Sequence, residues 1–466
     1  MIRRGVVRPE GKDMAGKDAG LPTVQSGNSQ SSEIQLTPRG AWGVMALLMA
    51  FMVINYGDRA VLALAARPVM SELGLSAQQY GLISSSFFFL FSLSAVAMAY
   101  LATRVALKWL LLILAALWAL TQVPVFFAAG VTTLFANRII LGAAEGPAGP
   151  LANSMAHSWF PPERRGLPSA LISSGASLAK IFLAPILTLL ILGPGWRYAF
   201  LALAALGLVW TLGWMIKGRT GPYATSSSGT APGKRSTHAG GPATARETFR
   251  WAVCNRTFAG LLLATFPMYG LTTVVISWMP AYLESGLGFS PMQAGFLYGL
   301  PSIAALALML GAGDGTDRLL RCGISPRVAR GLVPTLAICL GGAMVALLPV
   351  AAAEHRWAAV VLLMAGYGFG TLGIPVSYAA IGTLAEPSQR SSVLSLFIAM
   401  QTFSGVIAPW LTGVFVDAGD TQADGYNTAF VVIGSTIVVA AAVGALLVDP
   451  TRDDVVARLR RRAGAS

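Results

Sequence analysis

Five charged residues lie within long apolar stretches of the sequence, where a charge is costly unless it does chemistry. They are Asp58, Arg59, Arg138, Glu145 and Lys180. A charge in the hydrocarbon region of a membrane costs at least ~2.5–3.5 kcal/mol on insertion scales and commonly marks a functional site. With both carboxylates ionised, the three basic groups outnumber the acidic groups by one. This surplus of positive charge predicts a buried site for an anion.

Protonation of either carboxylate would strengthen such a site, because removing a negative charge raises the local positive potential. The residues therefore indicate a route to cotransport of a proton with an anion. Glu145 is seven residues from the nearest charge in its own stretch, which makes it the better proton carrier. Asp58 adjoins Arg59 and either titrates or simply holds an arginine, so the two carboxylates form a coupled pair.

A purely structural interpretation of these charges competes with the functional one. Arg138 and Glu145 share a helix face about two turns (~10.5 Å) apart, so with Asp58 and Arg59 they could pair and hold two helices together. Two facts weigh against this structural interpretation. Small residues in this region already allow close helix packing at lower cost, and the pairing leaves Lys180 without a partner. Lys180 could face lipid or form a lone salt bridge. Its functional alternative is a point charge for a carboxylate.

The whole chain has the composition of an integral membrane protein. Of its 466 residues 55% are hydrophobic and only 11% are charged, whereas a soluble domain is about a quarter charged. The net charge of +13 would alone suggest a nucleic-acid partner. A chain with so few charges cannot build a polar exterior, so we expect a lipid bilayer around it and no nucleic acid.

Twelve apolar runs reach the roughly 20 residues that a spanning helix needs. The longest polar interruption divides them six and six, which is typical of a transporter with two bundles and a central site. The predicted spans are 41–66, 79–102, 107–129, 131–153, 166–192, 195–217, 256–283, 291–312, 329–352, 356–384, 391–416 and 427–448.

We therefore expect an all-α integral membrane protein with five segments. These are a disordered cytoplasmic tail (1–40), an N-terminal six-helix bundle (41–217), a cytoplasmic linker (218–255), a C-terminal six-helix bundle (256–448) and a basic cytoplasmic tail (449–466). Basic residues mark the cytoplasmic side of membrane proteins, and 27 of the 33 lie in the tails, the linker and alternate loops. Both termini are expected in the cytoplasm, with the protein in the inner or plasma membrane.

Short motifs occur in a fixed order along the spans. INYGDR (Ile54–Arg59) lies in the first span, and Arg138 with Glu145 forms an R-x6-E pair in the fourth. The others are WFPPERRG (Trp159–Gly166), GWRYAF (Gly195–Phe200), SWMPAYL (Ser277–Leu283), GFSPMQAG (Gly288–Gly295) and GDGTDRLLRCGIS (Gly313–Ser325). In these motifs, over about residues 50–416, the chain resembles the major facilitator superfamily, and within it the anion:cation symporter family of organic-acid transporters.

The resemblance implies twelve helices in two six-helix bundles, alternating access, and symport of a sugar acid or other organic anion with protons or another cation. By position in the motifs it implies that Asp58 and Glu145 carry protons. It likewise implies that Tyr56, Arg59 and Arg138 bind substrate or couple it to the proton.

The gating motif of that family is intact in one half only. Asp317 and Arg318 match it in the C-terminal half. In the N-terminal half Arg104 is kept, but Thr103 and Ala106 stand where Asp and Gly are expected. We expect Asp317, Arg318 and Arg104 to form the gate, with a weaker cytoplasmic latch in the N-terminal half.

Two further departures concern the substrate. Phe91 aligns where some sugar-acid members have Tyr, and Ala176 where a Gln is common, with Lys180 one turn further on. The loss of two groups that bind hydroxyls, together with the gain of a lysine, predicts a less hydroxylated carboxylate, aromatic or aliphatic. Lys180 is then a substrate-binding residue.

The C-terminal half has no charge near mid-depth, so we expect it to make uncharged contacts. Tyr378 and Gln401 are the strongest candidates for substrate binding, because they fall well inside their spans. The others, as consistent with packing as with binding, are Tyr269, Trp278, Tyr298, Tyr367 and Ser377.

The predicted function is a secondary active transporter that takes up a small organic anion, a carboxylate or sugar acid, by proton- or cation-coupled symport. One alternative is a transport-inactive membrane sensor of an organic acid, although both tails are short. Another is a proton-driven exporter, although Ala184-Pro185 lacks the flanking glycines of that class. No nucleophile–base set, nucleotide-binding loop or metal-binding spacing occurs, so we expect no enzyme, cofactor or metal. We expect a monomer.

Overall fold

The computed structural model describes residues 40–101, 104–127, 130–161, 164–224, 255–325, 327–384 and 390–449. Within these ranges the secondary structure is helical, without strands. The two predicted tails lie outside the described residues, apart from Gly40 and Asp449, and so does most of the predicted linker. Residues Thr37–Ser466 form one compact unit, so the boundaries of the two bundles at residues 217 and 256 stay a prediction.

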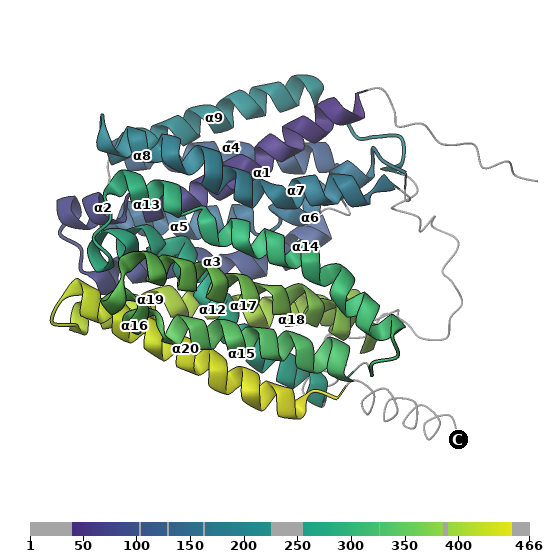
Figure 1. The fold of residues 1–466 in the computed structure, drawn as a ribbon. Helices are drawn as coiled ribbons and strands as arrows, with labels where there is room; N and C mark the ends of the chain where they lie inside the picture. The colour runs from purple at the N-terminus through teal and green to yellow at the C-terminus, as the bar shows by residue number, and fades with distance from the viewer. Residues whose placement is uncertain are drawn as a thin grey trace, which may run out of the picture. The chain divides into compact units, whose positions relative to one another are not determined.

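The helices follow the predicted spans closely (Figure 1). Those of the N-terminal half are α1 (Ala41–Leu64), α2 (Ala66–Leu73), α3 (Ala77–Leu101), α4 (Leu107–Phe127), α5 (Val131–Glu145), α6 (Ala148–His157), α7 (Gly166–Leu178), a π-helix (Ala179–Leu183), α8 (Ala184–Leu192) and α9 (Trp196–Lys217). Those of the C-terminal half are α12 (Arg256–Ala281), a π-helix (Tyr282–Gly286), α13 (Pro291–Leu297), α14 (Leu300–Arg321), a π-helix (Val328–Leu332), α15 (Val333–Ala346), α16 (Leu348–Glu354), α17 (Arg356–Leu384), α18 (Arg390–Thr402), α19 (Ser404–Ala418) and α20 (Gln422–Leu447).

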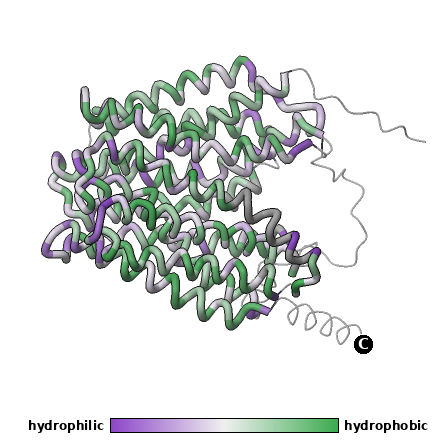
Figure 2. Tube along the Cα trace, in the orientation of Figure 1, coloured by the Kyte–Doolittle hydropathy of each residue, from purple (hydrophilic) through white to green (hydrophobic). Residues whose placement is uncertain are grey.

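Most of these helices have the length and composition of membrane spans. Among the described residues nine helical segments are long and apolar enough to cross a membrane, or ten if the bent pair α15–α16 is one span. The predicted spans 79–102 and 131–153 correspond to α3 and to the pair α5–α6. Figure 2 shows hydrophobic residues along the helices and hydrophilic residues gathered near their ends. The predicted all-helical membrane architecture is confirmed.

Two of the differences from the predicted boundaries concern residues of the candidate site or gate. The fourth span is interrupted at Gly146–Pro147, where α5 ends and α6 begins, because proline has no N–H to continue the hydrogen-bond ladder. The eighth span was expected to end near residue 312, but α14 continues to Arg321. Arg318, placed in a loop by the sequence, therefore lies in the last turn of a helix.

Close backbone packing fixes the helix that carries two of the five charges. A methyl group on Gly142 of α5, or on Gly146 directly after it, would overlap the carbonyl oxygens of Phe87 and Phe91 on α3. Glycine at these two positions lets the backbones touch. The expected small-residue packing is thus confirmed here, and it sets where Arg138 and Glu145 stand relative to α3.

The two halves of the chain are joined by a cap on the first turn of α3. The Asp417 carboxylate, at the end of α19, accepts hydrogen bonds from the backbone N–H of Ala77 (2.8 Å) and of Gln78 (2.7 Å). A carboxylate at a helix N-terminus satisfies unpaired N–H groups and complements the helix dipole. The cap therefore holds α19 of one half against α3 of the other.

Further contacts between the halves lie at the same end of the helices, which is the end where α2 lies (Figure 1). The Tyr80 hydroxyl donates to the Ser277 carbonyl at 3.1 Å, and Arg67 pairs with Glu284 at 3.2 Å. Together with the Asp417 cap, these contacts close this end of the path between the halves.

A cluster at this end also ties α2 to α9. The Glu72 carboxylate accepts hydrogen bonds from Trp196 Nε1 (2.6 Å) and Arg197 Nη1 (2.5 Å). These two donors hold the pKa of Glu72 below its usual range, because they stabilise the ionised carboxylate. Arg197 thus lies in the first turn of α9 with an acid beside it.

Candidate anion and proton site

The centre of the site is an ion pair between α1 and α5. Arg59 Nε donates to Glu145 Oε2 at 2.5 Å, and the Glu145 side chain is fully buried. Arg59 Nη2 also donates to Asn55 Oδ1 at 3.2 Å, one helical turn earlier. The sequence left open whether Asp58 holds the adjacent Arg59. The structure gives that role to Glu145, because successive residues of a helix point about 100° apart.

Asp58 instead joins a network of neutral polar side chains. Gln122 Nε2 on α4 donates to Asp58 Oδ1 at 2.8 Å. Asn137 Nδ2 donates to the Thr121 carbonyl at 2.7 Å and lies 3.4 Å from Gln122 Oε1. Sequence reasoning missed Gln122 and Asn137. The available signal was a pair of amide side chains inside apolar spans, where they need partners.

Arg138, on α5, also contacts Asp58. Its Nη1 donates to the Asp58 carbonyl at 3.1 Å, and the side chain is 3% exposed. Its Nε and Nη2, and Asp58 Oδ2, are buried without a hydrogen-bond partner among the described residues. Buried polar atoms are nearly always paired in native structures. Arg138 therefore presents two donors suited to a carboxylate.

These donors border a cavity between the two halves. Its lining includes Arg59, Arg138 and Tyr80 from the N-terminal half and Ser277 from the C-terminal half. The cavity volume is about 20 Å³, which is room for about one water molecule. An organic acid can enter only when the helices around it move apart.

Aromatic rings surround the Arg59 guanidinium. Its central carbon lies 4.9 Å from the ring centroids of Tyr56 and Phe91, and 5.3 Å from that of Phe87. Cations are attracted to the faces of such rings. Phe91, singled out in the sequence as a departure from the sugar-acid pattern, thus lies at the site, and so does Tyr56.

Lys180 lies in the π-helix that interrupts the fifth span. It is 5% exposed, so the lipid-facing alternative is wrong. Its Nζ donates to Ser302 Oγ on α14 at 2.8 Å and lies 5.4 Å from the centroid of the Tyr298 ring. No carboxylate within the described ranges forms an ion pair with it, so the salt-bridge alternative fails as well.

Tyr378 and Gln401 bond to one another. The Tyr378 hydroxyl donates to Gln401 Oε1 at 2.6 Å, and Gln401 Nε2 lies 3.5 Å from the Thr265 carbonyl. No hydrogen bond or ion pair between described residues joins them to the five charges. Of the C-terminal tyrosines, Tyr298 borders the site: its hydroxyl donates at 3.1 Å to the carbonyl of Ile276, which lines the cavity.

The gating residues lie at helix ends away from this cluster. Arg104 is exposed in the turn before α4, and Arg318 is exposed in the last turn of α14. The side chain of Asp317 lies outside the described part of the structure, as does Thr103. Their role in a gate stays a prediction.

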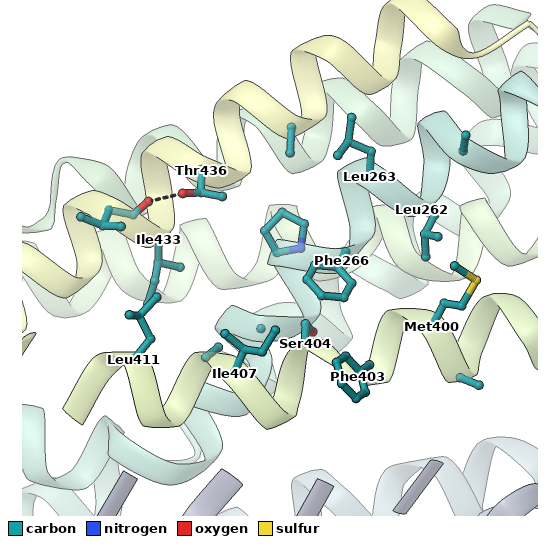
Figure 3. A pocket seen from close by; sticks show the side chains of 17 residues that line it. Leu262, Leu263, Phe266, Met400, Phe403, Ser404, Ile407, Leu411, Ile433 and Thr436 are labelled. Carbon is teal, nitrogen blue, oxygen red and sulfur yellow. Dashed lines mark hydrogen bonds between the residues drawn. The ribbon is translucent and has the colours of Figure 1, made fainter. Parts of the chain in front are cut away.

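A second, larger cavity lies elsewhere. It has a volume of about 800 Å³ and lies within the C-terminal half, between α12, α18, α19 and α20 (Figure 3). Its two hydroxyls are already bonded, because Ser404 donates to the Gln401 carbonyl at the end of α18 and Thr436 to the Val432 carbonyl of its own helix. The other lining side chains are apolar. Without a charge or a free polar group, it offers nothing to hold an anion. No group of metal ligands occurs among the described residues either.

Comparisons with known proteins agree with this fold. The Major Facilitator Superfamily model matches residues 48–333 and 324–465. The chain is 25% identical over 447 residues to a probable galactarate/D-glucarate transporter of Bacillus subtilis, covering 90% of this chain and 95% of the relative. It is 27% identical over 418 residues to a probable sulfoacetate transporter of Cupriavidus necator, covering 88% and 93%. The crystal structure of a bacterial homologue of the human lysosomal transporter Spinster, inward-facing and unoccupied, has a TM-score of 0.69 at 19% identity and covers 90% and 99%.

The fold and the buried charges define a multi-pass membrane transporter. The chain belongs to the Major Facilitator Superfamily, and it is a transporter rather than an enzyme. The predicted fold is thereby confirmed.

Proposed function

We propose that this transporter takes up a small organic anion, a carboxylate or sugar acid, by proton-coupled symport with alternating access. The Arg59–Glu145 ion pair carries the proposal. When Glu145 is ionised, it neutralises Arg59. When Glu145 takes up a proton, the guanidinium loses its counter-ion and is free to bind a carboxylate of the substrate. Proton binding and anion binding then depend on one another.

Asp58 and Arg138 form a second pair in which the carboxylate binds a proton and the guanidinium binds the anion. Arg138 keeps Nε and Nη2 free of partners among the described residues, and Asp58 keeps Oδ2 free. A substrate carboxylate can take both free donors of the guanidinium in a bidentate geometry. Asp58 and Glu145 are therefore the proton-coupling residues, and Arg59 and Arg138 the anion-binding residues.

The similar transporters support an organic anion as cargo, because both are named for acids. The rings of Phe87 and Phe91 beside Arg59 favour an acid with few hydroxyl groups. A clear preference in uptake for a polyhydroxy acid over aliphatic and aromatic acids would contradict this part of the proposal.

The contacts between the halves support alternating access. Asp417, Tyr80 and Arg67 close the path at the end where α2 lies. With both termini in the cytoplasm, that end faces the exterior of a cell membrane, so this conformer is closed to the outside. Transport requires these contacts to open and a cytoplasmic gate to close in turn.

Uptake into proteoliposomes with and without an imposed pH gradient tests the proposal. Glu145→Gln keeps a side-chain oxygen that can accept from Arg59 but cannot release a proton. We expect it to abolish proton-driven accumulation of the transported acid while counterflow exchange continues within about threefold of the wild type. Accumulation at the wild-type level would remove Glu145 from proton coupling.

A matched substitution separates this effect from a general loss of folding. Glu354 is exposed at the end of α16, and Glu354→Gln makes the same chemical change outside the site. It should leave both accumulation and counterflow at the wild-type level. Loss of counterflow in Glu145→Gln as well would show that the substitution breaks the site rather than the coupling.

A further inference from the structure

Lys180 is a buried cation that forms no ion pair with any acidic residue of the described ranges. It is 5% exposed, and Ser302 Oγ is the only hydrogen-bond acceptor that the described residues offer to its Nζ. An ammonium group has three N–H donors, so two are unused by described residues. A buried charge without a counter-ion is costly, and its retention at this place calls for an anion that binds during the transport cycle.

The π-helix Ala179–Leu183 places this charge toward the other half of the molecule. Such single-turn insertions occur frequently at functional sites. The backbone of Lys180 packs against Gly299, and its side chain reaches Ser302 and the ring of Tyr298. The Tyr298 hydroxyl donates in turn to the Ile276 carbonyl at 3.1 Å, and Ile276 lines the cavity that Arg59 and Arg138 border. A single tyrosine thus separates Lys180 from this cavity, and an anion that enters it can bridge the lysine and the arginines.

Counting charges shows what kind of anion this is. Arg59, Arg138 and Lys180 against Asp58 and Glu145 leave a net charge of +1 when both carboxylates are ionised. A monoanion would neutralise that site without any proton. When one carboxylate is protonated the site has a net charge of +2, and only a dianion neutralises it. A site that binds a proton together with its cargo is thus electrically balanced by a cargo with two negative charges.

We propose that the substrate is a compact dianion, a dicarboxylate or a sulfonated carboxylate, and that Lys180 binds its second anionic group. The first group binds at Arg59 and Arg138, so this inference rests on the proposed function. Ser302 holds the ammonium while no substrate is bound, and it yields the ammonium to the anion, because a hydrogen bond between two charged groups is about twice as strong as one to a neutral hydroxyl. Lys180 then determines specificity between dianions and monoanions.

Two pairs of probes that differ in one end group test the inference. Glucarate and gluconate share a hydroxylated six-carbon chain, and adipate and 6-hydroxyhexanoate share a plain one; in each pair the first is a dianion and the second a monoanion. Initial uptake rates into proteoliposomes give KM and kcat for each. We expect the wild type to favour the dianion of at least one pair tenfold or more in kcat/KM.

Lys180→Met should remove this preference, so that the ratio falls to one or below, mainly through a higher KM for the dianion. In this variant the site is neutral with both carboxylates ionised, so a monoanion with one proton becomes the balanced cargo. Lys180→Arg should restore the dianion preference within about threefold. Ser302→Ala should keep the preference and lower KM for the dianion, because a competing acceptor is gone.

Lys108 provides the matched control, since its ammonium lies at a helix end against the Met215 carbonyl at 3.4 Å. Lys108→Met should keep the wild-type preference. If Lys180→Met fails to reach the membrane, Lys180→Gln takes its place. The preference for the dianion can then also be measured as the thermal stabilisation of the purified protein by each probe.

The outcomes separate this inference from the proposed function. If uptake is proton-driven but the ratio of kcat/KM for the dianion to that for the monoanion is the same in the wild type and in Lys180→Met, the inference is overturned. The proposed function then still stands. A wild type that takes up neither member of either pair, nor any other organic acid, would overturn both.

Discussion

At the scale of single residues, the proposed site pairs two residues that are adjacent in sequence with different partners. Asp58 and Arg59 are adjacent in α1, yet Asp58 bonds to Gln122 on α4 while Arg59 pairs with Glu145 on α5. If they bonded to one another, their charges would cancel within α1 alone. Since they do not, each carboxylate can gain or lose a proton beside a different arginine.

Arg138 gives the first prediction at this scale. Its Nη1 holds the Asp58 carbonyl, and its Nε and Nη2 have no partner among the described residues. Hydrogen bonds to charged groups contribute about 1.5–3 kcal/mol each. Arg138→Ala should therefore raise the Kd of the transported acid roughly 10- to 100-fold, measured by tryptophan fluorescence or isothermal titration on the purified protein.

The control for this variant is an arginine outside the site. Arg164 is exposed in the loop before α7, so Arg164→Ala should leave Kd unchanged. An unaltered Kd in Arg138→Ala would show that this arginine is structural. It would then favour the interpretation that Arg138 and Asp58 only hold their helices together.

Residue types and spacing singled out charges that the structure brings together in pairs, Arg59 with Glu145 and Arg138 with Asp58, because ionisable groups within apolar spans are rare. They did not predict the partners. Glu145 is 86 residues from Arg59, and only the packing of α1 against the other helices decides which face each side chain takes. For the same reason the hydrogen bond between Tyr378 and Gln401 was not predicted, and their role in substrate binding stays a prediction. Depth within a span does not reveal that two polar groups will satisfy one another.

At the scale of elements, the cap on α3 is a contact that must break when the molecule opens. The Asp417 carboxylate is held by two N–H groups of the opposite half, and loss of such a cap costs about 0.5–2 kcal/mol. Asp417→Asn should therefore shift the conformational equilibrium toward the state open at this end, by roughly 2- to 30-fold at 1.4 kcal/mol per factor of ten.

Spin-label distances between residues 79 and 420, in a variant lacking the native cysteines, can measure this shift. The fraction of long distances should rise in Asp417→Asn. Asp424→Asn removes a carboxylate at the same end whose one side-chain partner among the described residues is Thr421, in the cap of its own helix, and it should leave the distances unchanged. Identical distributions in Asp417→Asn and the wild type would show that the cap does not hold this end closed.

Hydrophobic runs predicted the elements themselves, because a span needs a fixed length of apolar residues. The interruptions within these spans could not be predicted from the sequence. The π-helix at Lys180 depends on how the fifth span packs against α1 and α14, and no residue type encodes such an insertion. The extension of α14 to Arg321 likewise shows that polarity alone does not end a helix at the membrane surface.

At the scale of the whole molecule, the distribution of basic residues predicts orientation. Labelling of single cysteines at positions 72 and 219 with a membrane-impermeant maleimide checks it. In intact cells we expect labelling at 72 and none at 219, and labelling at both after permeabilisation. Labelling of 219 in intact cells would invert the topology, and the end closed by Asp417 would then face the cytoplasm.

The direct backbone contact between α3 and α5 has a mechanical consequence. Because Gly142 and Gly146 lie against carbonyl oxygens of α3, these helices cannot slide past one another without a collision. Arg138 and Glu145 therefore travel with α3 as one rigid part whenever the path opens. The spacing of these charges then stays nearly constant through the cycle, and what varies is which reservoir of water can reach them. Proton uptake and release are in that case timed by access to solvent on either side of the membrane.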